Sequence, residues 1–151
     1  MSDIPSTSAP EVSAELPRFD SFGLAPEILR ALQEQGYVHP TPIQAQAIPV
    51  VLQGRDVMGA AQTGTGKTAG FSLPIIQILM AHANSSASPA RHPVRALILT
   101  PTRELADQVA DNVKAYSRFT KLSSTVVHGA VDIEPQTTTL RNGVESVIET
   151  T

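Results

Sequence analysis

The chain has 151 residues, which is enough for one domain of ordinary size. It contains no cysteine, which excludes disulfides and thiolate metal sites, and its four histidines lack the spacing of metal ligands. The formal net charge of -3 argues against a globally basic nucleic-acid binder. No stretch resembles a signal peptide or is apolar enough to span a bilayer, so we expect a soluble cytoplasmic protein.

The first part of the chain predicts a leader and two helices. Residues 1–17 are rich in Ser, Pro, Ala and Glu and lack apolar periodicity, so we expect them to be disordered. Residues 26–36 place apolar side chains on one helical face, between a proline in the first turn and a terminal glycine. Helical spacing returns in residues 41–54, where Pro49 should bend the helix.

A strand, a glycine-rich loop and a helix are predicted to follow one another from residue 56. The apolar segment DVMGAA, residues 56–61, predicts a short buried strand. It leads into AQTGTGKT, residues 61–68, and the helix is expected to follow through residue 81. A phosphate-binding loop requires this order, because the N-terminus of the helix must point at the anion.

Four loop residues fit the binding of a nucleotide phosphate. Gly64 and Gly66 let successive main-chain N–H groups converge on an anion. Lys67 can reach the terminal phosphates, and the Thr68 hydroxyl group can take one position on Mg²⁺. The general pattern G-x-x-x-x-G-K-[ST] fails at Ala61. The alternative is a Gly/Thr turn between strand and helix, and a phosphate loop alone leaves kinases, GTPases, motor ATPases and transporters open.

The second half of the chain alternates strands with helices. After a loop of turn-forming residues, the pattern predicts strands at 94–100, 122–129 and 144–149, an amphipathic helix at 102–119, and a poor helix or turn at 134–143. Such alternation implies right-handed crossovers and a mainly parallel sheet covered on both faces, the α/β class.

Three segments resemble motifs of the DEAD-box RNA helicases. GYVHPTPIQ (36–44), AQTGTGKT (61–68) and PTRELA (101–106) are similar to the family's Q motif, motif I and motif Ia. VVHGAVDIEPQ (126–136) is similar to the family's glycine-doublet region. The sequence as a whole looks closest to the bacterial RhlE-like subgroup. The resemblance covers nearly everything after residue 18. It implies a RecA-like P-loop NTPase fold, a doubly wound parallel sheet that is incomplete at the C-terminus, and an ATP-dependent RNA helicase.

The resemblance also implies a nucleotide site for ATP. Gln44 would pair with the adenine edge, since an amide offers one donor and one acceptor, and Phe19 would stack on the ring. Thr41 would support the phosphate loop. The alternatives are a solvent-facing Gln44, a core anchor at Phe19 and a helix cap at Thr41. The implied nucleotide-binding residues are Phe19, Thr41, Gln44, Gln62, Thr63, Gly64, Thr65, Gly66, Lys67 and Thr68, and Thr68 would also bind Mg²⁺.

By the same resemblance, PTRELA would contact an RNA backbone. It lies where a strand passes into a helix, so free N–H groups near Pro101 and Thr102 can meet a phosphodiester, with Arg103 adding charge. The alternative is a simple helix cap, with Arg103 paired to Asp107. Gly129 matches the first glycine of the doublet, although alanine replaces the second. Residues 91–121 carry six bases against three acids, an excess that suits sequence-independent RNA contact or, alternatively, a solvated surface.

The sequence contains no counterpart of the family's Asp-Glu-Ala-Asp motif or of its second RecA-like domain. We therefore assign no catalytic residue and expect residues 18–151 to be a partial ATP-binding domain. Two alternatives to a helicase remain for this chain: a nucleotide-binding remnant without turnover, and a truncated product without activity. The expected strand at 56–60 would also lack its ladder neighbours, so we expect weak stability.

Overall fold

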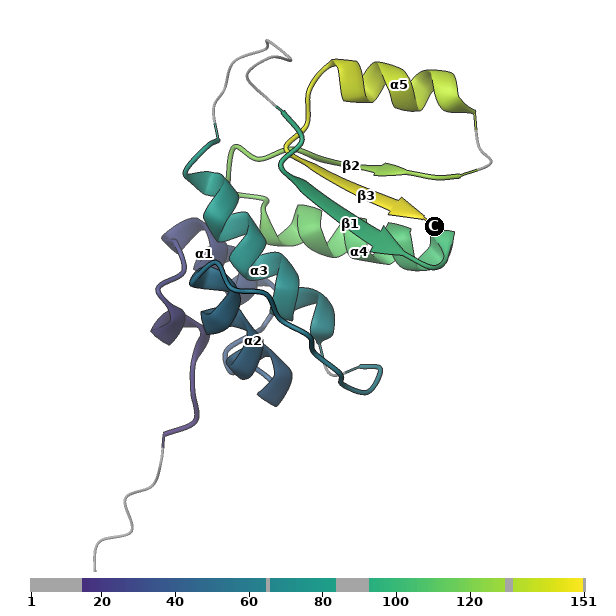
Figure 1. Ribbon diagram of the computed structural model, residues 1–151. Helices are drawn as coiled ribbons and strands as arrows, with labels where there is room; N and C mark the ends of the chain where they lie inside the picture. The colour runs from purple at the N-terminus through teal and green to yellow at the C-terminus, as the bar shows by residue number, and fades with distance from the viewer. Residues whose placement is uncertain (1–14, 65, 84–92, 130–131, 151) are drawn as a thin grey trace, which may run out of the picture.

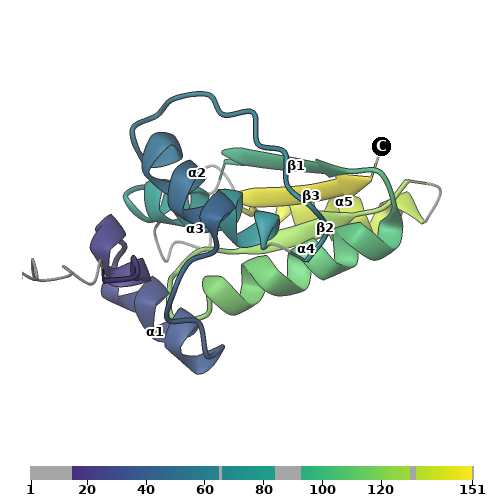
Figure 2. The same ribbon diagram turned by 90° about the horizontal axis from the view of Figure 1, so that it is seen from below.

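The computed structural model describes residues 15–64, 66–83, 93–129 and 132–150 (Figure 1). The helices α1, α2 and α3 lie together at one side, and the remaining helices flank a small sheet (Figures 1 and 2). The elements, in chain order, are η1 (Phe19–Phe22), α1 (Pro26–Glu34), α2 (Pro42–Leu52), α3 (Lys67–Met80), β1 (Ala96–Thr100), α4 (Arg103–Tyr116), β2 (Ser124–Val127), α5 (Ile133–Arg141) and β3 (Ser146–Thr150).

The three strands form a parallel sheet in the order β1-β3-β2, which confirms the α/β class. The last strand in sequence is the central one, because β3 pairs with both of the others. Ile148 of β3 lies opposite Ile98 of β1 on one side and Val126 of β2 on the other. The carboxyl ends of all three strands therefore lie at one edge of the sheet.

Helix α4 covers one face of the sheet and α5 lies over the other (Figure 1). Ile98, Val126 and Ile148 pack against a stripe of small and branched residues on α4. Because side chains alternate along a strand, Leu97 and Leu99 face away from α4, and they are 59% and 58% exposed. The expected coverage of both faces is therefore incomplete over β1.

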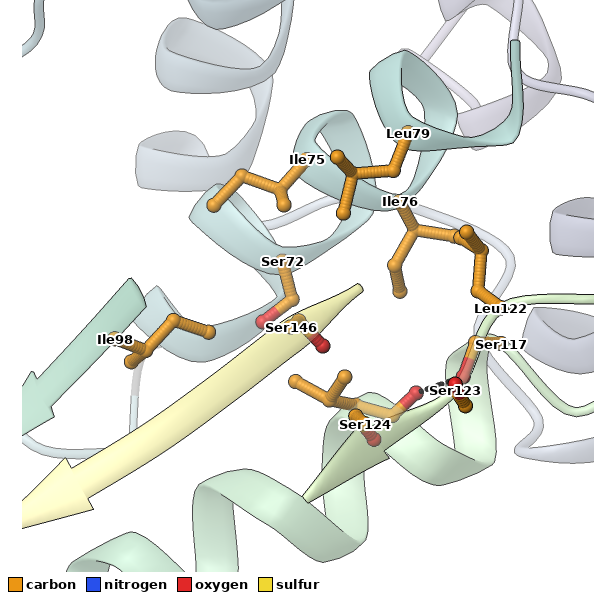
Figure 3. Close-up of a pocket in the computed structure, with 11 residues that line it drawn as sticks. Ser72, Ile75, Ile76, Leu79, Ile98, Ser117, Leu122, Ser123, Ser124 and Ser146 are labelled. Carbon is orange, nitrogen blue, oxygen red and sulfur yellow. Dashed lines mark hydrogen bonds between the residues drawn. The ribbon is translucent and has the colours of Figure 1, made fainter. Parts of the chain in front are cut away.

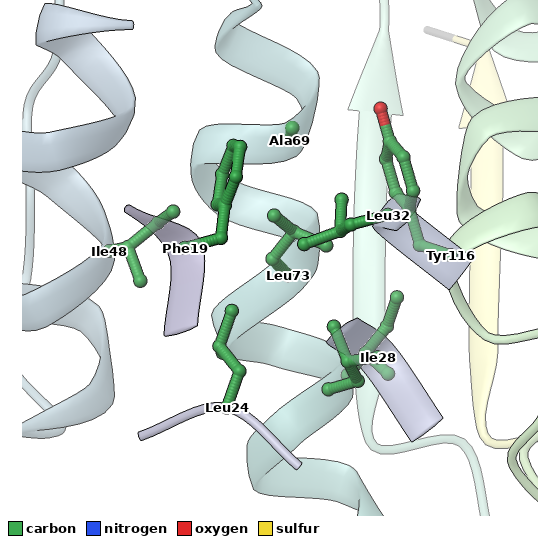
Figure 4. Close-up of a cluster of buried hydrophobic side chains, with 9 residues drawn as sticks. Phe19, Leu24, Ile28, Leu32, Ile48, Ala69, Leu73 and Tyr116 are labelled. Atoms are coloured by element: carbon green, nitrogen blue, oxygen red, sulfur yellow. The ribbon is translucent and has the colours of Figure 1, made fainter. Parts of the chain in front are cut away.

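The helical part has its own apolar core. Figure 4 shows Phe19, Ile28, Leu32, Ile48 and Leu73 pointing toward one another from η1, α1, α2 and α3. Each of these side chains is buried. The two helices predicted upstream of the glycine-rich loop are confirmed, and α2 continues through its internal proline.

One local prediction was wrong. Residues 56–61 form no strand, because no described strand lies beside them to pair with their N–H and C=O groups. The side chains of Val57 and Met58 are exposed. The segment 134–143, expected to be a poor helix or turn, is a helix, α5. Its start is stabilised by Asp132, whose side chain accepts a hydrogen bond from Glu134 N.

The leader expected at residues 1–17 lies almost entirely outside the described residues, and 15–17 belong to no helix or strand. Within the part of the chain that the structure describes, no helix is both long and apolar enough to cross a membrane.

Candidate nucleotide-binding site and sheet edge

The glycine-rich loop leads directly into helix α3. Gly64 and Gly66 have φ angles of 84° and 78°, values that side chains with a Cβ rarely adopt. The first helical hydrogen bond runs from Gly70 N to Gly66 O at 3.2 Å. The N–H groups at the start of the helix, those of Lys67 and Thr68 among them, therefore precede the helical hydrogen-bond ladder and are available to an anion.

Gln44 joins this loop to helix α2. Its side chain is buried, its Oε1 accepts a hydrogen bond from Thr41 N at 3.0 Å, and its Nε2 donates to Gly66 O at 3.0 Å. A Cβ placed on Gly66 would collide with the Gln44 amide nitrogen. The solvent-facing alternative for Gln44 is therefore wrong, while its pairing with adenine stays a prediction.

Thr41 occupies the position before α2 and forms a reciprocal capping box with Gln44. The alternative of a helix cap is thus correct. The same residue also lies beside the loop, because its Cγ2 is 3.8 Å from the position of a Cβ built on Gly66. Capping and support of the phosphate loop are compatible at this position.

Phe19 is buried, with only 4% of its surface exposed, and its ring meets Phe22 edge to face with a centroid separation of 6.2 Å. This is the environment of a core anchor, and stacking on adenine stays a prediction. Phe19 also borders an open groove of about 320 Å³, where Tyr37 and Val38 are half-exposed.

The remaining loop residues differ in their exposure. Gln62, Thr63 and Gly64 are exposed, and Thr65 lies outside the described residues. Thr68 is half-buried in the first turn of α3, whereas Lys67 is exposed. In the described part of the chain, no group of three or more His, Asp or Glu residues could hold a metal ion by itself.

The residues expected to contact RNA gather at the carboxyl edge of the sheet. Pro101, Thr102 and Arg103 follow β1 and are exposed. The Thr102 side chain caps α4 by accepting a hydrogen bond from Leu105 N at 3.2 Å. Thr100 Oγ1 lies 3.2 Å from the Thr102 carbonyl oxygen, to which it donates. The turn is therefore fixed on the strand, and the cap and an RNA contact can coexist.

Gly129 reaches the same edge from β2. It is exposed, and its N–H group donates to Thr150 Oγ1 at 3.1 Å. Among the described residues, a Cβ on Gly129 would meet only that oxygen, at an ordinary 3.7 Å. The fold thus tolerates a methyl group here, and the space above Gly129 is open to solvent. Ala130 lies outside the described residues.

The proposed pair between Arg103 and Asp107 does not form among the described residues. Asp107 Oδ1 instead lies 2.9 Å from His128 Nε2, which ties α4 to the end of β2. The basic excess of the sequence is also dispersed in space. Arg103 and Lys114 lie at opposite ends of α4, about 16 Å apart along its axis. Arg118 pairs with Glu34 at 2.8 Å, so only part of the excess faces the sheet edge.

Comparison with known proteins identifies relatives for most of the chain. The chain is 40% identical over 134 residues to the DEAD-box ATP-dependent RNA helicase RhpA of Helicobacter pylori, covering 89% of this chain and 25% of that protein. It is 46% identical over 116 residues to the ATP-dependent RNA helicase SrmB of Haemophilus influenzae, covering 77% and 26% respectively. The RhlB helicase of Pectobacterium carotovorum is 42% identical over 134 residues, covering 89% and 31%.

The chain therefore spans between a quarter and a third of the length of these relatives. Its structure contains a glycine loop that opens a helix and a parallel sheet whose carboxyl edge carries PTRELA. Residues 41–151 match the sequence profile described as DEAD/DEAH box helicase. The chain belongs to the DEAD/DEAH box helicase family.

Proposed function

We propose that the chain is the N-terminal part of an ATP-dependent RNA helicase, in which ATP binding and hydrolysis are coupled to the unwinding of RNA duplexes. The observation that carries the proposal is the Gln44 bridge, which joins the capped start of α2 to the phosphate loop at Gly66. A loop held in this way is preorganised, so less conformational freedom is lost when a nucleotide binds. The helicase relatives share this part of the sequence.

In this proposal the main-chain N–H groups of residues 64–68 hold the phosphates of ATP, and Lys67 neutralises their charge. The Thr68 hydroxyl group and the phosphate oxygens fit Mg²⁺, which prefers oxygen ligands. Gln44 reads the adenine edge only if its amide exchanges the hydrogen bonds to Thr41 and Gly66 for bonds to the base. Phe19 borders the base from the helical core. Bound Mg²⁺ supplies charge neutralisation to the phosphates.

RNA would bind at the carboxyl edge of the sheet. The N-terminus of α4, with exposed Thr102 and Arg103, offers main-chain donors and one cation to phosphodiesters. Pro101 fixes the turn, and Gly129 leaves room for a nucleotide backbone to approach. Contacts of this type do not depend on base identity, so we propose binding without sequence specificity. We further propose residues 18–151 as a partial RecA-like domain acting in the cytoplasm.

A second candidate is a nucleotide-binding remnant without turnover. The exposure of residues 56–60 favours this second candidate. This segment should anchor the phosphate loop to the sheet, but in the structure it lies outside the sheet. A loop anchored only on the side of α2 would still bind phosphate, but less tightly.

Calorimetric titration of the chain with ATP and ADP tests the nucleotide site. Heat that disappears in Lys67→Ala, with an unchanged circular dichroism spectrum, supports phosphate binding at this loop. Absence of heat from the original chain would contradict it. RNA-stimulated phosphate release distinguishes a helicase from a nucleotide-binding remnant. The remnant would bind ATP but would release no phosphate from it.

A further inference from the structure

The main chain that follows β2 is held by hydrogen bonds to one side chain of α5. His128 N donates to Gln136 Oε1 at 2.7 Å, and Gln136 Nε2 donates back to His128 O at 3.3 Å. The same Nε2 also donates to Asp132 O at 3.0 Å. The Gln136 amide thus uses its donor and its acceptor on the two polar groups of one residue, and it fixes the orientation of both peptide planes.

Two further side chains hold the same short segment. Asp107 of α4 contacts the His128 ring at 2.9 Å, and Thr150 of β3 accepts the Gly129 N–H at 3.1 Å. The end of β2 is therefore held by α4, α5 and β3. Of these contacts, the Gln136 amide is the one that binds the main chain at two points.

We propose that Gln136 is a positioning residue for RNA binding: it presents the main chain of His128 and Gly129 to the RNA backbone, in register with the N-terminus of α4. This inference rests on the proposed function, because it requires RNA at the carboxyl edge of the sheet. Gln136 is half-buried beneath this segment. Thr139 on the same helix is exposed, and among the described residues its side chain makes only a local hydrogen bond to Pro135 O. Gln136 thus acts through the segment and does not itself touch RNA.

Gln136→Met tests the role, because methionine has a similar length but cannot form the paired hydrogen bonds. Binding of a fluorescein-labelled oligouridylate to the full 151-residue chain is measured by fluorescence anisotropy at low salt. We expect the RNA Kd to rise about fivefold, within the range of coupling between contacting residues. The affinity for ATP should match that of the control variant Thr139→Ala, whereas the thermal midpoint should fall, because three hydrogen bonds are lost. RNA binding is therefore measured well below the thermal midpoint of each variant.

A double-mutant cycle separates positioning from a general structural role. Gly129→Ala is compatible with the fold but places a methyl group where the RNA backbone would lie. If Gln136 acts through this segment, Gln136→Met adds little further loss of RNA affinity to Gly129→Ala, whereas it adds fully to Arg103→Ala. Full additivity with Gly129→Ala or an unchanged RNA Kd in Gln136→Met would each overturn the role.

The same variants distinguish failure of this inference from failure of the proposed function. If Arg103→Ala and Gly129→Ala weaken RNA binding while Gln136→Met does not, only the positioning role is refuted. If the original chain binds no RNA, or if neither Arg103→Ala nor Gly129→Ala changes the Kd, the RNA site itself is wrong and the positioning role is refuted with it.

Discussion

Gln44 Nε2 donates a hydrogen bond to Gly66 O at 3.0 Å, joining two residues that lie 22 positions apart in the chain. Through this contact, the start of α2 and the phosphate loop form one unit. The bridge explains why a glutamine is suited to this position: its acceptor serves Thr41 N while its donor serves the loop. Any change that displaces the Gln44 amide should therefore affect the loop as well as the helix cap.

Gly66→Ala should disable the phosphate loop. The added methyl group would collide with the Gln44 amide, and the φ angle of 78° is unfavourable for alanine. We expect a loss of about 1–3 kcal/mol in the free energy of unfolding and no detectable heat on titration with ATP. Gly54→Ala is a matched control, because its φ is 75° but a Cβ there meets no atom of the described residues within 4 Å. Retained ATP binding in Gly66→Ala would contradict the bridge.

Ser72→Ala should leave stability unchanged or raise it. Ser72 lies in α3 beside a cavity of about 10 Å³, and its buried hydroxyl group has no hydrogen-bond partner in the described part of the chain (Figure 3). Removing a buried polar group without a partner recovers its desolvation cost, so we expect a gain of up to about 1 kcal/mol in urea unfolding.

Ser117→Ala provides the contrast for this experiment. The Ser117 hydroxyl group borders the same cavity, but it donates to Val113 O at 2.7 Å. Removing this hydroxyl group breaks a formed hydrogen bond, so the midpoint of urea unfolding should fall or stay constant. If Ser72→Ala is the more damaging of the two, the assignment of Ser72 as an unpaired group is wrong.

Alkaline pH should destabilise the chain through Tyr116. Burial, and then the neighbouring Tyr37, raise the pKa of Tyr116 to about 12 from 10.0. The folded state therefore disfavours the phenolate: the stabilisation is complete below pH 10 and is lost as the pH rises through 12. The loss should be about 1–3 kcal/mol in the free energy of unfolding. Tyr116→Phe should flatten this part of the stability profile, and an identical profile in both proteins would contradict the assignment.

The isolated chain should be weakly stable and prone to associate. Strand β1 is an edge of the sheet, it contains no charged residue, and Leu97 and Leu99 are exposed on one of its faces. Edges of this kind recruit other strands. Leu99→Lys should lower light scattering on heating without lowering the midpoint. A monomeric, cooperative transition with a high midpoint in the original chain would contradict this prediction.

The sequence by itself determined the features that depend on residues adjacent in the chain. Glycines at 64 and 66 set the loop, and α3 begins at Lys67 as expected, because φ angles and helix starts are local properties. The alternation of segments indicated a parallel α/β sheet, and the structure has one. The apolar face predicted for residues 26–36 likewise identified part of the helical core, since Ile28 and Leu32 are buried in it.

Tertiary structure alone decided which groups meet. The apolar pattern of residues 56–61 predicted a strand, yet a strand needs a partner for its N–H and C=O groups, and the described chain provides none there. The sequence could not predict that Gln44 pairs with Gly66, or that Gln136 pairs with His128. A side-chain amide can bond any donor and acceptor that folding brings within about 3 Å. Local preferences fix backbone angles, whereas hydrogen-bond partners distant in sequence exist only once the chain has packed.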